Sequence, residues 1–465
     1  MTAIHRMLAL AALLAIATVS PVAAQPSTGS EPAPDAACRV AAVDYKGWKA
    51  QQISNRWVQL IVVPQNGGRL MQVTFDGHAY LFVNPKLAGK YLPPSQEHWF
   101  NYGGDKLWLL PEGDDDEQHW RGNSDLIDDG PFSFRELPPG LADDHACTVE
   151  LTGPADPQTG VQFIRTIRLD RDSPHIGFTA IMKNVSGHSL EWSMQSVSQY
   201  DTADPGNPSH RNAEIWGFTP ANPLSAYLNR YHVRFGPAEN PAAAVRDDGL
   251  FSIHYAHLAA ELWVDSTAGW LAVVDGGSRY AMVERFQYDQ HKPYPGKASV
   301  IFWTNGPQLR WGNDGEASLS KASEDSPLYM EAEINSPMCR LRPGETCQLE
   351  TDWFPARADA EFHGVTDAGI VAKPLAAVRL ENGKVRLSGS FGVFFAGRLV
   401  AKFYDDHGSM LATTAVGEAS PAKLAVLETE IAASGKPHRV SLHLEDQRGL
   451  DRGALGEVTI RDSAR

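Results

Sequence analysis

Alternating apolar and polar positions predict β-strands rather than helices along most of the chain. Trp57 to Val63 is apolar and β-branched, and a similar run resumes at Arg69 to Phe75 after Asn66-Gly67-Gly68. Asp76-Gly77 is a strong two-residue hairpin signal, and His78 to Val83 supplies the returning strand. We therefore expect antiparallel strands joined by tight turns.

Short strand patterns separated by turn residues recur throughout the chain, and helical periodicity is scarce. An all-β chain with this many strands is a sandwich or a barrel. Because the first strand-rich region is long for one small sandwich, we expect an extended sandwich of two large sheets. Further predicted strands are 147–151, 161–169, 175–183, 190–197, 269–275, 280–286, 299–304, 328–334 and 347–354.

Shifts in composition divide the chain into four parts. Residues 1–24 have a weakly basic start, an apolar run and a small-residue cleavage site, which predicts a signal peptide. Residues 25–37 are rich in Pro, Ser, Glu and Ala and read as a disordered leader. Strand signals lapse between Phe354 and Pro374. We expect a large domain at 38–357 and an accessory β-sandwich (Ig-like) at 372–465.

Net charge and hydropathy limit the classes of partner that the protein can bind. The formal net charge of −15 argues against nucleic-acid binding, which needs a basic surface. The apolar run of the predicted signal peptide is too short to span a bilayer comfortably, and no later apolar run reaches its length. We therefore expect a periplasmic or secreted protein whose partner is a small neutral molecule or a sugar. The sequence does not indicate its oligomeric state.

The four cysteines read as structural. In an oxidising compartment they permit two disulfides with three possible pairings. Cys339 and Cys347 flank Arg342-Pro343-Gly344, and a three-residue hairpin loop there would place them opposite each other. We predict a bond between this pair and leave the pairing of Cys38 and Cys147 open.

The stretch from Glu97 to Trp108 gathers aromatic, amide and charged side chains around Gly103-Gly104. A sugar ring stacks on aromatic faces while its hydroxyl groups bind to amide and charged groups, so this composition suits a sugar-sized ligand. The alternative is a tight turn between buried strands, with the tryptophans in the core. The candidate ligand-binding residues are Arg69, Asn101, Tyr102, Asp105, Lys106 and Trp108.

Through this stretch and several shorter motifs, residues 40–355 resemble an exported bacterial "domain of unknown function" family related to galactose mutarotase-like folds. Asn101 to Trp108 is the most specific piece. The other matching pieces are Gly67-Gly68-Arg69, Asn84-Pro85, Tyr294-Pro295, Met330-Glu331, Leu341 to Glu345 and Trp353.

The resemblance implies a β-supersandwich that binds carbohydrate on its concave face. In aldose mutarotases a late-strand glutamate acts as the base, and Glu331 occupies the similar place here. The resemblance implies His98 or His119 as the acid, although the motif around His119 matches poorly. Residues 195–199 contain no histidine where mutarotases carry a second one. We expect Asn101, Asp105 and Lys106 to face one cavity with Glu331.

The leading hypothesis is an exported carbohydrate-binding protein with a mutarotase-like fold, with or without catalysis. One alternative is an aldose 1-epimerase or related sugar isomerase that uses Glu331 as its base. A further alternative is a polysaccharide lyase or hydrolase, in which Arg69 and Lys106 neutralise a uronate. No cofactor is expected, and the run Asp114 to Glu117 is interpreted as a solvated loop rather than a metal site.

Overall fold

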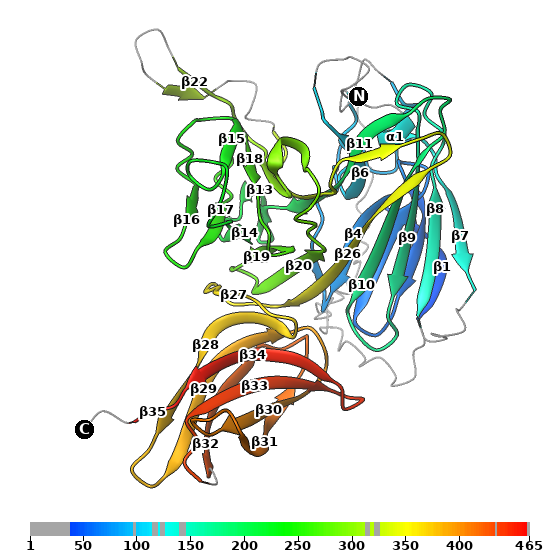
Figure 1. Ribbon diagram of the computed structural model, residues 1–465. Helices are drawn as coiled ribbons and strands as arrows, with labels where there is room; N and C mark the ends of the chain where they lie inside the picture. The colour runs from blue at the N-terminus through cyan, green and yellow to red at the C-terminus, as the bar shows by residue number, and fades with distance from the viewer. Residues whose placement is uncertain are drawn as a thin grey trace, which may run out of the picture. The chain divides into compact units, whose positions relative to one another are not determined.

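The computed structural model describes residues 38–95, 99–113, 120, 126–138, 146–311, 317–319, 326–432 and 435–462. Within these ranges the chain is almost entirely β, with one short helix, α1 (Leu126–Asp129), and one 3-10 turn, Pro295–Lys297 (Figure 1). The predicted all-β fold with two large sheets is confirmed.

The first large sheet joins strands from the early, middle and late parts of the region before residue 357. Its order is β1-β2-β3-β4-β6-β11-β24-β21-β18-β15, with β5 on β4 and β25 on β11. Its strands are β1 (Arg39–Tyr45), β2 (Trp48–Ser54), β3 (Val58–Val63), β4 (Arg69–Phe75), β5 (His78–Ala79), β6 (Asp105–Leu110), β11 (Leu190–Asp201), β15 (His232–Phe235), β18 (Ala260–Val264), β21 (Val300–Thr304), β24 (Tyr329–Asn335) and β25 (Cys339–Leu341).

The second large sheet has the order β16-β17-β14-β19-β20-β26-β10-β9-β8-β7. Buried apolar residues of both sheets, such as Leu60 and Ile167, form one continuous core. The strands of this sheet are β7 (Ser133–Leu137), β8 (Cys147–Thr152), β9 (Val161–Leu169), β10 (Ile176–Asn184), β14 (Ile215–Pro220), β16 (Ala243–Val245), β17 (Leu250–His254), β19 (Trp270–Asp275), β20 (Tyr280–Phe286) and β26 (Thr346–Arg357).

The chain after residue 363 forms two smaller sheets with a core of their own. One has the order β27-β28-β29-β32 with β35 on β28, and the other is β31-β30-β33-β34. The expected division of this region from 38–357 stays a prediction. The strands are β27 (Gly364–Val365), β28 (Gly369–Arg379), β29 (Lys384–Val393), β30 (Gly397–Tyr404), β31 (Met410–Ala419), β32 (Ala425–Ala432), β33 (Arg439–Asp446), β34 (Asp451–Thr459) and β35 (Arg461–Asp462).

Two further ribbons have two strands each. They are β12 (Ala203–Asp204) with β13 (Asn207–Arg211), and β22 (Leu309–Trp311) with β23 (Ala317–Leu319).

The turns follow the chemistry of the sequence. Asp76 and Gly77 have positive φ angles of 49° and 80°, as a type I′ turn requires, and they join β4 to β5. Gly103 and Gly104 also have positive φ. A Cβ on Gly103 would lie 2.1 Å from the Phe82 carbonyl oxygen, so the glycine lets the chain press against neighbouring backbone as it enters β6.

Both disulfides link the two large sheets. The predicted Cys339–Cys347 bond is confirmed, and Cys38 bonds to Cys147. Cys339 starts β25, which pairs with β11, whereas Cys347 lies in β26, which pairs with β10. The predicted hairpin between these cysteines is therefore replaced by a link between sheets. Cys38 immediately precedes β1, and Cys147 starts β8. Two disulfides suit an oxidising compartment.

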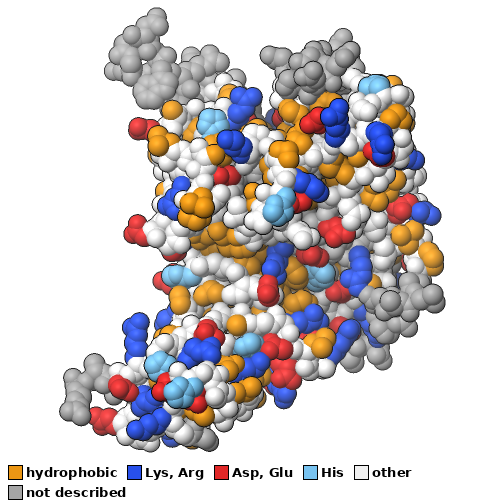
Figure 2. Space-filling view, in the orientation of Figure 1, with side chains coloured by type: hydrophobic (Ala, Val, Ile, Leu, Met, Phe, Trp, Pro, Cys, Tyr) orange, Lys and Arg blue, Asp and Glu red, His pale blue; other side chains and the backbone are white. Residues whose placement is uncertain are grey.

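The predicted signal peptide and leader lie outside the described residues, so export stays a prediction. No helix among the described residues is long and apolar enough to cross a bilayer. On the face drawn in Figure 2, basic side chains are interspersed with acidic ones. The expectation that the chain binds no nucleic acid is not tested by this view and stays a prediction.

A buried polar network also ties the large sheets together. Asp105 on β6 forms an ion pair with Arg165 on β9, and it accepts hydrogen bonds from Ser196 and Ser198 at 3.3 and 3.2 Å. Tyr200 on β11 donates a hydrogen bond of 2.5 Å to Glu284 on β20. Glu284 is fully buried, and burial raises its pKa to about 8, although the hydrogen bond from Tyr200 acts to lower it.

We expect Glu284 to make the stability of the fold depend on pH. Because its folded-state pKa lies above the unfolded value, its stabilising contribution is complete below about pH 4.5 and is lost as pH rises through about 8. Between pH 5 and pH 8 the Tm of the native protein should fall by roughly 5 °C more than that of Glu284→Gln. Thermal unfolding monitored by circular dichroism measures this difference. Glu350→Gln, at an exposed position of β26, is the matched control. Equal pH profiles for the native protein and Glu284→Gln would contradict the assignment.

Candidate functional site

One row of side chains crosses the first large sheet from β11 to β18. Gln199 on β11 lies opposite Glu331 on β24, which lies opposite Trp303 on β21, which lies opposite Glu261 on β18. Residues directly opposite each other in an antiparallel sheet share a face. The register therefore places two carboxylates, an amide and an indole on one surface.

A second row on the same face begins at β6. Lys106 lies opposite Val197, which lies opposite Glu333, and the row continues through Ile301 to Trp263. Next to it, Trp108 lies opposite Gln195. We call this surface the Glu331 face. Its charged, amide and indole side chains are those of Lys106, Trp108, Gln195, Gln199, Glu261, Trp263, Trp303, Glu331 and Glu333.

Glu331 is held by two neighbours. The Gln199 side-chain amide donates a hydrogen bond of 2.7 Å to its Oε1, and Lys106 Nζ lies 3.8 Å from the same atom. Glu331 is 6% exposed. Burial raises the pKa of Glu331, while Lys106 and the hydrogen bond from Gln199 act to lower it. Such a carboxylate is fixed in direction and ready to accept a proton.

Lys106 carries a buried ammonium group between aromatic rings. Its Nζ lies 3.9 Å from the centroid of the Trp108 ring and 5.2 Å from that of Trp99. Within the part of the chain that the structure describes, Lys106 Nζ has no hydrogen-bond partner. Burial lowers the pKa of Lys106, whereas the charges of Asp128 and Glu331 act to raise it. The ammonium group is thus positioned to donate hydrogen bonds to a ligand.

Glu333 is a second buried carboxylate on the same strand, and it accepts a hydrogen bond from the Gln195 side chain. Burial, followed by the charges of Glu331, Glu261 and Glu112, raises the pKa of Glu333 well above its ordinary value. Burial and the neighbouring carboxylates therefore favour the protonated form of Glu333.

Aromatic rings border these polar groups. Trp99 is 41% exposed, and Phe235 is 39% exposed. The Phe235 ring stacks on Trp303, with centroids 5.6 Å apart. Such accessible ring faces are what the C–H face of a sugar binds.

Arg69 points to the same side of the sheet as Lys106, because its neighbour Leu70 lies opposite Asp105, but two aspartates already occupy its guanidinium group. Its guanidinium group is fully buried and lies 2.7 Å from Asp128 Oδ1 and 3.2 Å from Asp129 Oδ1. Asp128 accepts hydrogen bonds from the indole N–H groups of Trp108 and Trp99 at 3.0 and 3.2 Å. Arg69 therefore fixes the carboxylate that orients the two rings, and we do not propose it as a ligand-binding residue.

The structure separates the other residues expected in one cavity. Lys106 and Trp108 reach the Glu331 face, but Asp105 points to the opposite face, into the network with Arg165. The expectation that Asp105 and Glu331 share a cavity is therefore wrong, because consecutive residues of a strand point to opposite faces. Asn101 and Tyr102 serve local structure: Asn101 accepts a hydrogen bond from the Gly103 N–H, and the Tyr102 hydroxyl accepts one from the Leu92 N–H.

The two candidate histidines, His98 and His119, and the acidic run Asp114 to Glu117 lie outside the described residues. The sequence analysis missed Gln199, Trp303 and Glu333 as site residues. One signal for Glu333 was available: in the strand predicted at 328–334, residues 331 and 333 must share a face. The sequence does not show which strands pair with that strand, so Gln199 and Trp303 could not be placed beside it.

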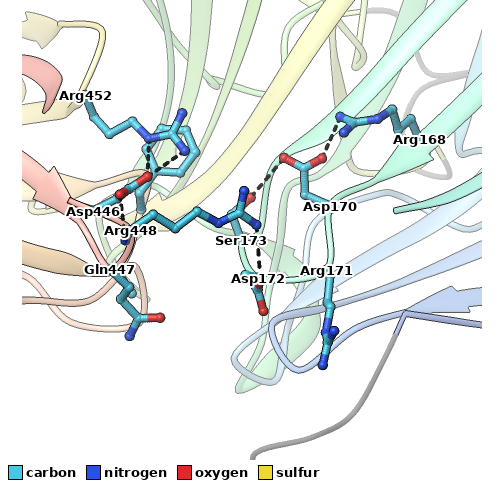
Figure 3. A pocket seen from close by; sticks show the side chains of 11 residues that line it. Arg168, Asp170, Arg171, Asp172, Ser173, Asp446, Gln447, Arg448 and Arg452 are labelled. Carbon is cyan, nitrogen blue, oxygen red and sulfur yellow. Dashed lines mark hydrogen bonds and ion pairs between the residues drawn. The ribbon is translucent and has the colours of Figure 1, made fainter. Parts of the chain in front are cut away.

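A separate polar pocket is lined by the turn between β9 and β10 and by residues from Phe395 to Arg452 (Figure 3). Apart from Arg171, its charged groups are paired: Arg168 with Asp170, Arg448 with Asp172, and Arg452 with Asp446. These pairs give the pocket a structural explanation. Among the described residues, no cluster of three or more His, Cys, Asp or Glu side chains has the arrangement of a metal site.

No protein-family model matches the chain, and no curated protein matches it. Similar solved structures include a galactose mutarotase-like protein from Clostridium acetobutylicum, with 10% identity and a TM-score of 0.44 over 69% of this chain and 99% of that one. Another is a galactose mutarotase-like protein from Lactobacillus casei, with 11% identity and a TM-score of 0.42 over 66% of this chain and 99% of that one.

A TPR-domain containing protein from Parabacteroides distasonis has 13% identity and a TM-score of 0.44 over 69% of this chain. This chain spans 48% of the length of that protein. Galactose mutarotase-like proteins, which the sequence motifs resemble, are thus among the similar structures. What the site can do chemically is inferred from its own residues and not from these similar structures.

We predict that Asp105→Asn lowers the free energy of unfolding by about 3 kcal/mol, because it leaves Arg165 buried without its charged partner. Urea unfolding followed by fluorescence gives this value. Asp406→Asn changes an exposed carboxylate and should alter the free energy by less than about 0.5 kcal/mol. An Asp105→Asn protein as stable as the native one would show that the network does not hold the sheets together.

Proposed function

We propose that the Glu331 face binds a carbohydrate. The main support is the convergence of Lys106, Gln199 and Glu331 beside the rings of Trp108 and Trp303. An ammonium group, an amide and a carboxylate provide both donors and acceptors for hydroxyl groups, and the rings provide stacking surfaces. This combination of a few aimed polar groups and aromatic rings is typical of small-molecule sites.

A titration that follows tryptophan fluorescence tests this proposal. Glucose, galactose and their β-linked oligosaccharides should change the emission of the native protein in a saturable way, because Trp99, Trp108 and Trp303 border the site. Glu331→Gln should weaken binding at least about tenfold, the effect of losing one charge-assisted hydrogen bond.

Glu350→Gln, on the second sheet, should bind as the native protein does. A Tm measurement on each variant separates lost binding from lost folding. Absence of any fluorescence change with every sugar would overturn the proposal.

A second candidate, aldose 1-epimerase activity, is favoured by the 3.8 Å separation of Lys106 Nζ and Glu331 Oε1. In this reaction Glu331 takes the proton of the anomeric hydroxyl group while Lys106 protonates the ring oxygen. The bond between the anomeric carbon and the ring oxygen breaks, and the aldehyde closes again from either side. The lyase alternative gains no such support, because Arg69 is engaged by Asp128 and Asp129.

Polarimetry on freshly dissolved α-glucose and α-galactose measures this activity. The rate should rise with pH as Glu331 ionises, through a pKa that burial raises, and fall again as Lys106 loses its proton at a pKa that burial lowers. Lys106→Met should remove the alkaline limb and most of the rate, whereas Lys86→Met, at an exposed position, should change neither. A rate equal to that of buffer with both sugars would exclude the epimerase and leave binding intact.

A further inference from the structure

The Glu331 face and its border contain more acidic than basic groups among the described residues. Glu331 and Glu333 lie on β24 and Glu261 lies on β18, with β21 between these two strands, and Glu112 interacts electrostatically with all three. The ammonium group of Lys106 already lies beside Glu331. The other basic groups near the face are Arg69, which is paired with Asp128 and Asp129, Arg234, which lies 6.0 Å from the Trp263 ring, and His232, opposite Trp263.

A buried acceptor in this cluster has no partner. Gln199 is fully buried, and its side-chain nitrogen donates to Glu331, but its Oε1 accepts no hydrogen bond from any of the described residues. An unsatisfied buried acceptor is costly, and it is best satisfied by a donor from a ligand. The groups next to Gln199 on this face are carboxylates, which accept hydrogen bonds when they are ionised. The partner that the side-chain oxygen of Gln199 lacks is therefore a hydrogen-bond donor.

The aromatic rings of the face already accommodate one cation. Lys106 Nζ lies 3.9 Å from the Trp108 ring centroid, within the range of a cation–π interaction. Trp99 lies next to Trp108, with ring centroids 6.4 Å apart, and is 41% exposed. A second cation arriving from solvent would therefore meet an accessible ring face and carboxylates together.

From these contacts we propose that the ligand of the Glu331 face is an amino sugar whose charged ammonium group binds among Glu331, Glu333 and Gln199. The inference rests on the carbohydrate-binding function proposed above and adds the charge of the sugar. An ammonium group offers three donors and no acceptor, which matches the carboxylates and the free oxygen of Gln199. A uronate would bring a further negative charge toward Glu261, Glu331 and Glu333.

Binding of a cation also has a consequence for protons. In the free protein, burial and the charges of Glu331, Glu261 and Glu112 raise the pKa of Glu333 and favour its protonated form, while Lys106 acts to lower the pKa. An ammonium group beside Glu333 favours its ionised form. Amino-sugar binding should therefore release a proton from Glu333, whereas binding of a neutral sugar should not.

Three β-1,4-linked tetrasaccharides of the same geometry, made of glucosamine, N-acetylglucosamine or glucose, test the inference by isothermal titration calorimetry. At about pH 5.5, where the amine is charged, the glucosamine tetramer should bind at least about tenfold more tightly than the other two, with a preference that declines as salt is added. Titrations in buffers of different ionisation enthalpy should show release of up to about one proton for this ligand alone.

Glu333→Gln should reduce the preference for the charged tetramer and abolish the proton release, while Glu350→Gln should keep both. Equal affinities for the three tetramers, or tighter binding of an uncharged one, would overturn the amino-sugar inference and leave carbohydrate binding standing. Binding of none of the three would overturn both proposals.

Discussion

Strand β6 carries two opposite charges at consecutive positions, and the two-residue period of a strand sends them to opposite faces of the first large sheet. Asp105 points toward the second sheet and pairs with Arg165, whereas Lys106 points away from it toward Glu331. The same short segment thus holds the sheets together on one side and supplies the cation of the candidate site on the other. A shift of β6 by one residue would exchange these faces and bury each charge among the wrong partners.

The burial of charged groups makes this arrangement costly in free energy. Each ionised group taken out of water costs several kcal/mol before its partner offsets the loss, so every member must be held in place. The glycines before β6 meet part of this demand, since Gly103 and Gly104 let the chain lie against the backbone of Phe82 and Leu70. Arg69 meets another part: by pairing with Asp128 it fixes the carboxylate to which two tryptophans donate.

The features that could be predicted from the sequence are local ones. Strand periodicity, the Asp76-Gly77 turn and the Cys339–Cys347 bond depend on residues close in the chain. Lys106, Trp108 and Glu331, which share one face of the first large sheet, were also candidates from the sequence, partly through a family resemblance. The partners of these residues were not, because Gln199 and Trp303 reach Glu331 through strand order and register. Asp105 was assigned to the wrong face because the start of β6 could not be located beside the glycines.

The two disulfides determine when the fold gains its covalent cross-links and its full resistance to unfolding. Each one fastens a strand at the edge of one large sheet, or a residue next to it, to a strand of the other sheet. Before oxidation, the sheets are held only by non-covalent contacts, which include their shared core and the Asp105 network. The covalent fastening is complete only where thiols are oxidised. The chain is therefore more easily unfolded while its thiols are reduced, and more resistant to unfolding once both disulfides have formed.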